Sequence, residues 1–476
     1  LADAAFSYSL MHSTRQQIRK LFALAAFWLL TAQSMALLAS DAVRNEVMNN
    51  PCNAGGVYLA YPGPADTLAV TPEGYEPFYI SHYGRHGSRY LISDDDYLRV
   101  AAPLQQAAAD SLLTPLGYDL LRRLGPVMEE AAGRGGELTP LGTRQHKGIA
   151  RRMFLTYPEV FTNDAVITAR STQVMRCAHS MMAFCESLKE MNPRLRIPKE
   201  SSSRWMSHLC WWTPEASYFD DHGPGKPAYN AFEKENVKSE RFLASILKNP
   251  ADLSRLKDHQ GKAVTADALM WGVFWIAVDL QNMETGHGPD AIAMFDIFTP
   301  EELYRLWRVT NFSFYYRHAD YPPVKGIGIA NARNLLENII DTADEYIAGN
   351  KGGATLRFGH DGNITPLSAL MQFSGFDGQE ADPEKVEDVW ASFRITPMAS
   401  NLQMILFRPA GADNAKPEDI LVKFMMNEHD VLLPIKSDNA PFYRWSDART
   451  FLKSRVEAAD KSIADTRKAL EGVSYK

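Results

Sequence analysis

The sequence predicts an α/β core, built on a mixed, mostly parallel sheet with helices on both faces, that is interrupted by an inserted all-α cap. Short apolar runs and helical patterns alternate over 40–190. The next segment, 191–328, holds six of the nine tryptophans in helical patterns and has no convincing strand. Strand-like runs then return in 329–476. A core formed by 40–190 and 329–476 and split by a cap of 191–328 accounts for this order.

The bulk composition is that of a large globular protein. At 476 residues the chain exceeds the size at which one hydrophobic core keeps growing. Apolar residues at 45% and charged residues at 22% are ordinary globular values. The formal net charge of -7 disfavours a nucleic-acid partner, which needs a basic face. A local arginine cluster can still bind a small anionic substrate, and the sequence predicts no oligomeric state.

Residues 1–39 have the pattern of an export signal. Basic residues precede the apolar run 21–39, and Ser34 and Ala36 are the small residues of a cleavage-like pattern. An uncleaved membrane anchor is the alternative, because the run is 19 residues long. We expect a periplasmic or secreted protein with no stable membrane insertion after removal of the signal.

The first part of the core alternates strand and helix signals. The apolar run 78–80 predicts a buried strand that ends in a polar loop. A helical region covers 98–113, and Thr139 can cap a further helix with Pro140 in its first turn. A second strand and a helix with apolar residues three and four apart follow at 165–172 and 173–191.

The cap and the second part of the core also show helix and strand patterns. The helix at 266–281 contains Asp267 and Asp279 and is too short to cross a membrane. A helix with one apolar face begins near Ile329 and ends at Gly349. The remaining elements are strands at 354–359, 402–409 and 420–427, a helix after the loop 360–366, and a charged terminal helix at 443–472.

The four cysteines predict neither a disulfide pattern nor a metal site. Cys177 and Cys185 lie eight positions apart on a predicted helix, about 12 Å along its axis, which is too far for a disulfide. Cys52 or Cys210 can pair with one of the others, and the connectivity is not readable. Because no CxxC or HExxH spacing is present, we expect buried structural cysteines and no metal.

The stretch "RHGSR", residues 85–89, gathers positive charge behind the strand 78–80. Arginine guanidinium groups match phosphate oxygens and stay charged at any working pH. A histidine between Arg85 and Arg89 would have its pKa lowered by the like charges, so His86 would be neutral and nucleophilic. Gly87 lets the backbone approach a ligand closely. The pattern indicates an oxyanion site around a histidine nucleophile, with a solvated basic loop as the alternative.

Three further stretches follow in order: "LTPLGTRQ" (138–145), "ARSTQVMRCAHS" (169–180) and "FGHDGNITPL" (358–367). Together with "RHGSR" they resemble the histidine acid phosphatase branch of the histidine phosphatase superfamily. In that family the RHGxR loop supplies the nucleophile, the downstream segment supplies a further arginine, and a late His-Asp pair completes the site. The resemblance implies phosphomonoester hydrolysis through a phosphohistidine and no cofactor.

Carried over residue by residue, the resemblance implies that His86 is the nucleophile. Arg85, Arg89 and Arg176 would hold the transferring phosphoryl group, whose charge arginines can neutralise without a metal. A covalent step on histidine divides one difficult displacement into two easier ones.

The late pair completes these roles. His360 would stabilise the phosphoryl charge, and Asp361 would protonate the leaving alcohol and then serve as base for the attacking water. The mechanism requires that His86 meet this pair in one pocket, although the two motifs lie far apart in the sequence.

Several nearby residues have less specific interpretations. Arg170 and His82 are candidates for support just outside the site, with a core role as the alternative for His82. Thr139 and Gln145 are expected to be scaffold, and His179 is expected to be packed. The cap residues His287, His318 and Arg317 could contact substrate, although a surface position is the favoured interpretation.

The motif details favour a subfamily and a substrate. The loop runs "RHGSRY" without the proline that many acid phosphatases carry one residue later, and its aromatic Tyr90 resembles the multiple inositol polyphosphate phosphatases. Those enzymes usually have His-Ala-Glu where this chain has His360-Asp361-Gly362, a pattern that resembles phytases and general acid phosphatases. Inositol polyphosphates (phytate) are therefore the first substrate, and a broad phosphomonoesterase is the alternative. A mutase-type phosphotransferase and a silent phosphate-binding protein are the alternatives of other classes.

Overall fold

The computed structural model describes residues 42–64, 71–412 and 416–475, and its centre is an eight-stranded sheet. The strands are β1 (Tyr75–Arg85), β2 (Val166–Ser171), β3 (Lys199–Glu200), β4 (Gly353–Gly359), β5 (Asn401–Pro409), β6 (Leu421–Met426), β7 (His429–Val431) and β8 (Tyr443–Arg444). Their order is β3-β2-β4-β1-β5-β6-β7, with β8 paired to β6. The export signal predicted at 1–39 lies outside the described residues.

The sheet is mixed, as predicted, but it divides into two halves. The strands β3, β2, β4 and β1 pair in parallel, whereas β5, β6, β7 and β8 join antiparallel to their neighbours. The antiparallel share is larger than predicted, because the last strands follow one another through short connections that reverse the chain. In the parallel half the register pairs Arg85 of β1 with Gly359 of β4, so the carboxyl ends of these two strands lie side by side.

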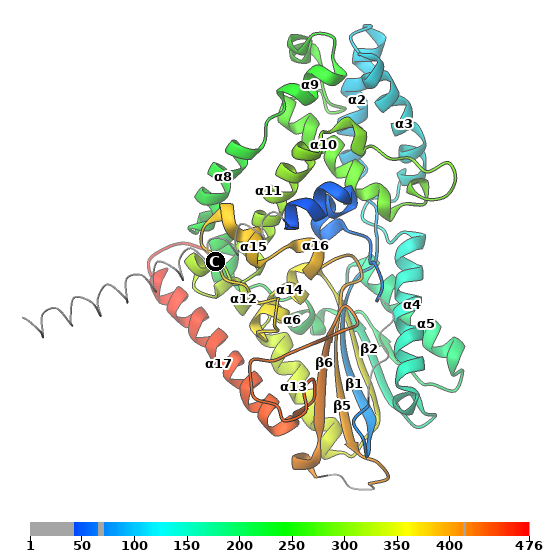
Figure 1. The fold of residues 1–476 in the computed structure, drawn as a ribbon, viewed down its shortest axis with the longest axis vertical. Helices are drawn as coiled ribbons and strands as arrows, with labels where there is room; N and C mark the ends of the chain where they lie inside the picture. Colours follow the sequence, from blue (N-terminus) through cyan, green and yellow to red (C-terminus); the bar gives the residue numbers. More distant parts are fainter. Residues whose placement is uncertain (1–41, 65–70, 413–415, 476) are drawn as a thin grey trace, which may run out of the picture.

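Helices cover both faces of the sheet (Figure 1). On one face lie α4 (Pro140–Thr156) and α5 (Met175–Met191), and on the other lie α13 (Arg333–Ala348) and α17 (Trp445–Ala469). Strand β1 serves both layers because its side chains alternate: Ile80 packs in the core under α4 and α5, whereas Tyr79 packs in the core under α13. The predicted cap on α4 is present, since Thr139 Oγ1 accepts a hydrogen bond from the Gly142 amide at 3.2 Å and Pro140 opens the helix.

A helical layer stands beyond the carboxyl ends of the parallel strands, in the upper part of Figure 1. It contains α8 (Gly225–Asn236), α9 (Glu240–Ile246), α10 (Ala266–Asp279) and α11 (Pro300–His318). Two helices from the predicted core segment, α2 (Asp95–Ala109) and α3 (Pro115–Ala131), pack against α10 and α9. The layer therefore draws on two stretches of sequence, because apolar faces on α2 and α3 are buried against the later helices.

The segment 191–328 is not wholly helical, so the all-α prediction is wrong at one point. Its residues Lys199 and Glu200 form β3 and pair with Ala169 and Arg170 of β2. A two-residue strand carries too short an apolar pattern to be recognised in sequence.

The other helices are short or connect these layers. They are α6 (Met206–Leu209), α7 (Pro214–His222), α12 (Ile327–Ala330), α14 (Asp361–Leu370), α15 (Val386–Val389) and α16 (Ser392–Ile395), with the 3₁₀ helices η1 (Pro51–Tyr58) and η5 (Leu280–Asn282) near the site. None of the helices in the described ranges is long and apolar enough to span a membrane.

Candidate active site

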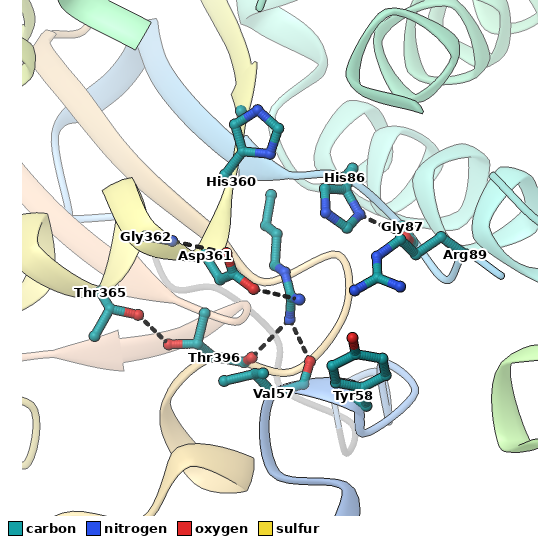
Figure 2. Close-up of polar contacts among 12 residues, drawn as sticks. Val57, Tyr58, His86, Gly87, Arg89, His360, Asp361, Gly362, Thr365 and Thr396 are labelled. Atoms are coloured by element: carbon teal, nitrogen blue, oxygen red, sulfur yellow. Dashed lines mark hydrogen bonds and ion pairs between the residues drawn. The ribbon is translucent and has the colours of Figure 1, made fainter. Parts of the chain in front are cut away.

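The ends of β1 and β4 bring the two histidine motifs together. His86 follows β1 and His360 follows β4, and the His86 amide donates to the Gly359 carbonyl at 3.0 Å. The two imidazole centroids lie 5.8 Å apart. Figure 2 shows His86, Arg89, His360 and Asp361 directed toward a common space above Tyr58. The convergence that the mechanism requires is therefore present.

The His86 imidazole is held as a neutral base. Its side chain is buried, and Nδ1 lies 2.9 Å from the Gly87 carbonyl, an oxygen that can only accept. Nδ1 therefore carries the proton and Nε2 carries the lone pair. Burial, and then the charges of Arg85, Arg176 and Arg89, hold the pKa of His86 well below its usual range. The ring thus presents an unprotonated nitrogen at any ordinary pH.

Arg85 is the fully buried centre of the cluster. Its Nη2 donates to Asp361 Oδ2 at 2.6 Å, and its Nη1 donates to the carbonyls of Thr396, at 3.0 Å, and Val57. Burial lowers the pKa of Arg85 to about 10, although the Asp361 charge opposes this, so the guanidinium stays charged. These contacts hold the guanidinium of Arg85 in place beside Asp361.

Arg89 and Arg176 complete the positive charge. The Arg89 guanidinium lies 4.6 Å from the centre of the Tyr58 ring and donates from Nη1 to the Tyr90 carbonyl at 2.8 Å. Arg176 stands in the first turn of α5. Burial and then the Arg89 charge lower the pKa of Arg176, which is the repulsion expected of guanidinium groups that face one space. A bound dianion would offset this repulsion.

His360 and Asp361 stand at the start of α14. The His360 Nε2 lies 3.2 Å from Thr172 Oγ1, and the Cys177 sulfur lies 3.7 Å from the same nitrogen. Burial lowers the pKa of His360 to about 4, opposed by Asp361. The ring is therefore neutral above this pH and carries a single N–H donor.

Asp361 is a carboxylate in the free protein. Its Oδ1 accepts from the Gly362 amide at 2.8 Å, while Oδ2 pairs with Arg85. Burial raises the pKa of Asp361, but the charge of Arg85, with smaller contributions from His360 and His318, outweighs burial and holds the pKa at about 2. To act as an acid, this group must gain a proton when substrate binds.

A cavity of about 470 Å³ opens beside these groups. Arg89 and Asp361 form its inner wall, and side chains of α8, α10 and α11 form the opposite wall. The leaving group of a substrate would occupy this space. Within the described ranges, no three His, Cys, Asp or Glu side chains are arranged to hold a metal ion.

His82 and Arg170, the two residues expected to support the site from outside, lie apart from this centre. His82 is buried between Phe184 and Phe358, and burial lowers its pKa to about 3, so it is a core residue. Arg170 stacks on Trp205 at 3.5 Å and has no hydrogen bond or ion pair with the site among the described residues.

The structure also places Gln145, His179, His318 and the four cysteines. Gln145 is scaffold, since its Oε1 accepts from the Ser88 amide at 2.8 Å. His179 was expected to be packed but is exposed, because it lies on the outer face of α5. His318 was expected at the surface but is buried against Trp212 and Gly362, close to Asp361. All four cysteines are free.

Sequence reasoning missed the polar support behind the nucleophile loop. The Asn282 amide accepts from Ser88 Oγ at 2.6 Å and donates to the Tyr58 carbonyl at 2.8 Å. Asn282 thereby ties the loop of His86 to the segment whose Tyr58 ring stacks on Arg89. The sequence carries no signal for these hydrogen bonds, because Ser88, Asn282 and Tyr58 are residues of common types and lie in separate segments.

Residues 126–427 match the histidine phosphatase superfamily (branch 2), which is more than half of the chain. The protein belongs to this family. The matched range includes Arg176, His360 and Asp361 but begins after the loop of His86. No curated protein sequence matches the chain.

Solved structures with the same fold include a multiple inositol polyphosphate phosphatase and a phytase. The multiple inositol polyphosphate phosphatase of Bifidobacterium longum, in complex with inositol hexasulfate, superposes with a TM-score of 0.70 at 18% identity, over 84% of this chain and 97% of that chain. The phytase from D. castellii superposes with a TM-score of 0.56 at 15% identity, over 85% of each chain. At these identities the likeness shows the fold.

Proposed function

We propose that this protein is a phosphomonoester hydrolase that works through a phosphohistidine. One observation carries the proposal: a neutral His86 with a free Nε2 lies among three guanidinium groups and opposite the carboxylate of Asp361. A silent phosphate-binding protein would need the arginines but not a nucleophile held in this tautomer.

The chemistry follows from these positions. His86 Nε2 attacks phosphorus while the bond from phosphorus to the leaving oxygen breaks, and the alcohol takes a proton from Asp361. Arg85, Arg89 and Arg176 neutralise the oxygens of the transferring group. Asp361, now a carboxylate, then takes a proton from water as the water attacks phosphorus and the P–N bond breaks. The products are alcohol, inorganic phosphate and the starting enzyme.

The proton on Asp361 should arrive with the substrate. Arg85 keeps the pKa of Asp361 at about 2 in the free protein. A bound dianion offsets the charge of Arg85, so it must raise this pKa. At pH 4, between the free and the raised value, anion binding should therefore take up protons, and anion affinity should strengthen as pH falls.

Calorimetry in buffers of different ionisation enthalpy measures this uptake. Inorganic sulfate is the probe, because it keeps its full charge at pH 4. His360, whose pKa is about 4, also takes up protons when the anion binds. The variant Asp361→Asn therefore serves to isolate the uptake by Asp361. The variant should take up fewer protons than the wild type; equal uptake would show that Asp361 does not titrate on binding.

For substrate we propose inositol polyphosphates, with phytate as the first example, and a broad range of phosphomonoesters as the second candidate. Tyr90 after "RHGSR" and the fold shared with an inositol polyphosphate phosphatase support the first. The sequence His360-Asp361-Gly362 in place of the His-Ala-Glu of those enzymes, and the aromatic walls of the cavity, favour the second. We further propose that the protein is exported.

Phosphate release from phytate, sugar phosphates and an aryl phosphate tests the substrate proposal. We expect turnover of phytate at least as efficient, in kcat/KM, as that of a sugar monophosphate. Negligible release from phytate beside rapid release from the other esters would establish the broad phosphomonoesterase instead.

A further inference from the structure

One stripe of α11 faces the leaving-group side of the cavity. Thr310, Ser313, Phe314 and Arg317 all line it, and their spacing of three, four and seven places them on a single helix face. The same cavity reaches Arg89 and Asp361. A ligand whose phosphate is at His86 would therefore extend toward α11.

Arg317 presents a guanidinium on this wall, and its charge opposes the burial that raises the pKa of the Asp220 carboxyl to about 6. Its Nε donates to the Tyr316 hydroxyl at 3.0 Å, and the guanidinium stands 5.2 Å from the centre of the Tyr316 ring. Among the described residues it forms no ion pair within 4.0 Å, although it is partly buried. By contrast, Arg305 on the same helix pairs with Glu301 at 3.1 Å. A held, partly desolvated guanidinium at a cavity wall is suited to an anionic ligand group.

Glu233 restricts what this ligand can be. It comes from α8 and lines the same cavity, and its Oε1 accepts from the Tyr229 hydroxyl at 2.8 Å. A carboxylate there repels a second phosphate but accepts hydrogen bonds from hydroxyl groups. The aromatic rings of Tyr58, Trp271 and Trp275 also line the cavity and suit the face of a ligand ring.

We infer that Arg317 and Glu233 are specificity-determining residues that select a ring alcohol bearing one further phosphate beside free hydroxyl groups. Arg317 binds the additional phosphate and Glu233 accepts from a hydroxyl. The inference rests on the proposed function and ranks ligands within its substrate class: partly phosphorylated inositols should bind more tightly than phytate, which remains a substrate. A fully phosphorylated ring would place one of its phosphates against Glu233.

Binding on a His86→Ala background tests this without turnover. Calorimetry measures the affinity of an inositol bisphosphate and of inorganic phosphate, with Arg317→Ala added and with Arg305→Ala as the matched control. We expect Arg317→Ala to lower the affinity for the bisphosphate by about tenfold more than the affinity for inorganic phosphate, because one charged hydrogen-bonded contact is lost. Arg305→Ala should leave that ratio unchanged. Equal weakening of both ligands by Arg317→Ala, or of neither, would overturn the assignment.

Glu233→Gln tests the second residue and keeps an acceptor for Tyr229. This substitution should raise the affinity for inositol hexakisphosphate several-fold relative to the affinity for the bisphosphate, since it removes one like charge. An unchanged ratio would refute the role of Glu233. A protein that fails to hydrolyse any ester yet shows these binding ratios would sink the proposed function and leave this inference standing.

Discussion

Replacement of His86 by alanine should abolish phosphate release, lowering kcat by at least about four orders of magnitude on every ester, because it removes the free Nε2 that attacks phosphorus among the three arginines. Phosphate binding should survive, since Arg85, Arg89 and Arg176 are unchanged. Steady-state kinetics and calorimetry with inorganic phosphate measure the two effects.

A trapping experiment sharpens this prediction. Wild-type protein quenched with base during turnover of a radiolabelled ester should retain an acid-labile label on His86. His179→Ala is the matched control, because that histidine is exposed on α5 and outside the site. It should keep full activity and the label. Residual hydrolysis by the His86 variant above the uncatalysed rate would assign the nucleophile elsewhere.

Replacement of Asp361 by asparagine should have an effect that depends on the leaving group. Alkyl and inositol phosphates release a basic alkoxide that needs a proton, so kcat should fall by about 10² to 10⁴. Aryl phosphates release a stable phenolate and should lose much less in the step that forms phosphohistidine. The substitution preserves the shape of the side chain. The amide oxygen of asparagine can still accept the hydrogen bond that the Gly362 amide donates to Asp361.

Kinetics on a series of phosphates with leaving groups of different basicity check this second prediction. The slope of log kcat/KM, which reports the steps through formation of the phosphohistidine, against leaving-group pKa should steepen in the variant. Thermal melting should be compared in parallel, because Asp361 also neutralises the buried Arg85. Equal losses of kcat/KM on alkyl and aryl esters would count against Asp361 as the acid.

Much of the core was predictable because its signals are local. The apolar run at 78–80 lies within β1, the run at 165–172 includes β2, and Thr139 caps α4 as its hydroxyl and the following proline require. The site residues His86, His360 and Asp361 were found because motif chemistry is carried by adjacent residues. Backbone propensity and side-chain chemistry are properties that a short segment has by itself.

Properties that depend on partners far away in the chain were not predictable. A short segment of sequence does not show that α2 and α3 pack with α9 and α10, that β3 joins β2, or that His318 is buried near Asp361.

The same division applies to the site. The sequence by itself determined which groups are the candidates for the chemistry: a histidine between arginines and a late His-Asp pair. Only the tertiary structure decided that they lie together, because parallel pairing of β1 with β4 aligns Arg85 with Gly359 and so places both loops at one edge. It also decided the tautomer of His86, the pairing of Asp361 with Arg85, and the presence of Arg317 in the cavity wall. Charge, tautomer and specificity depend on the distances between groups, and those distances exist only in the folded chain.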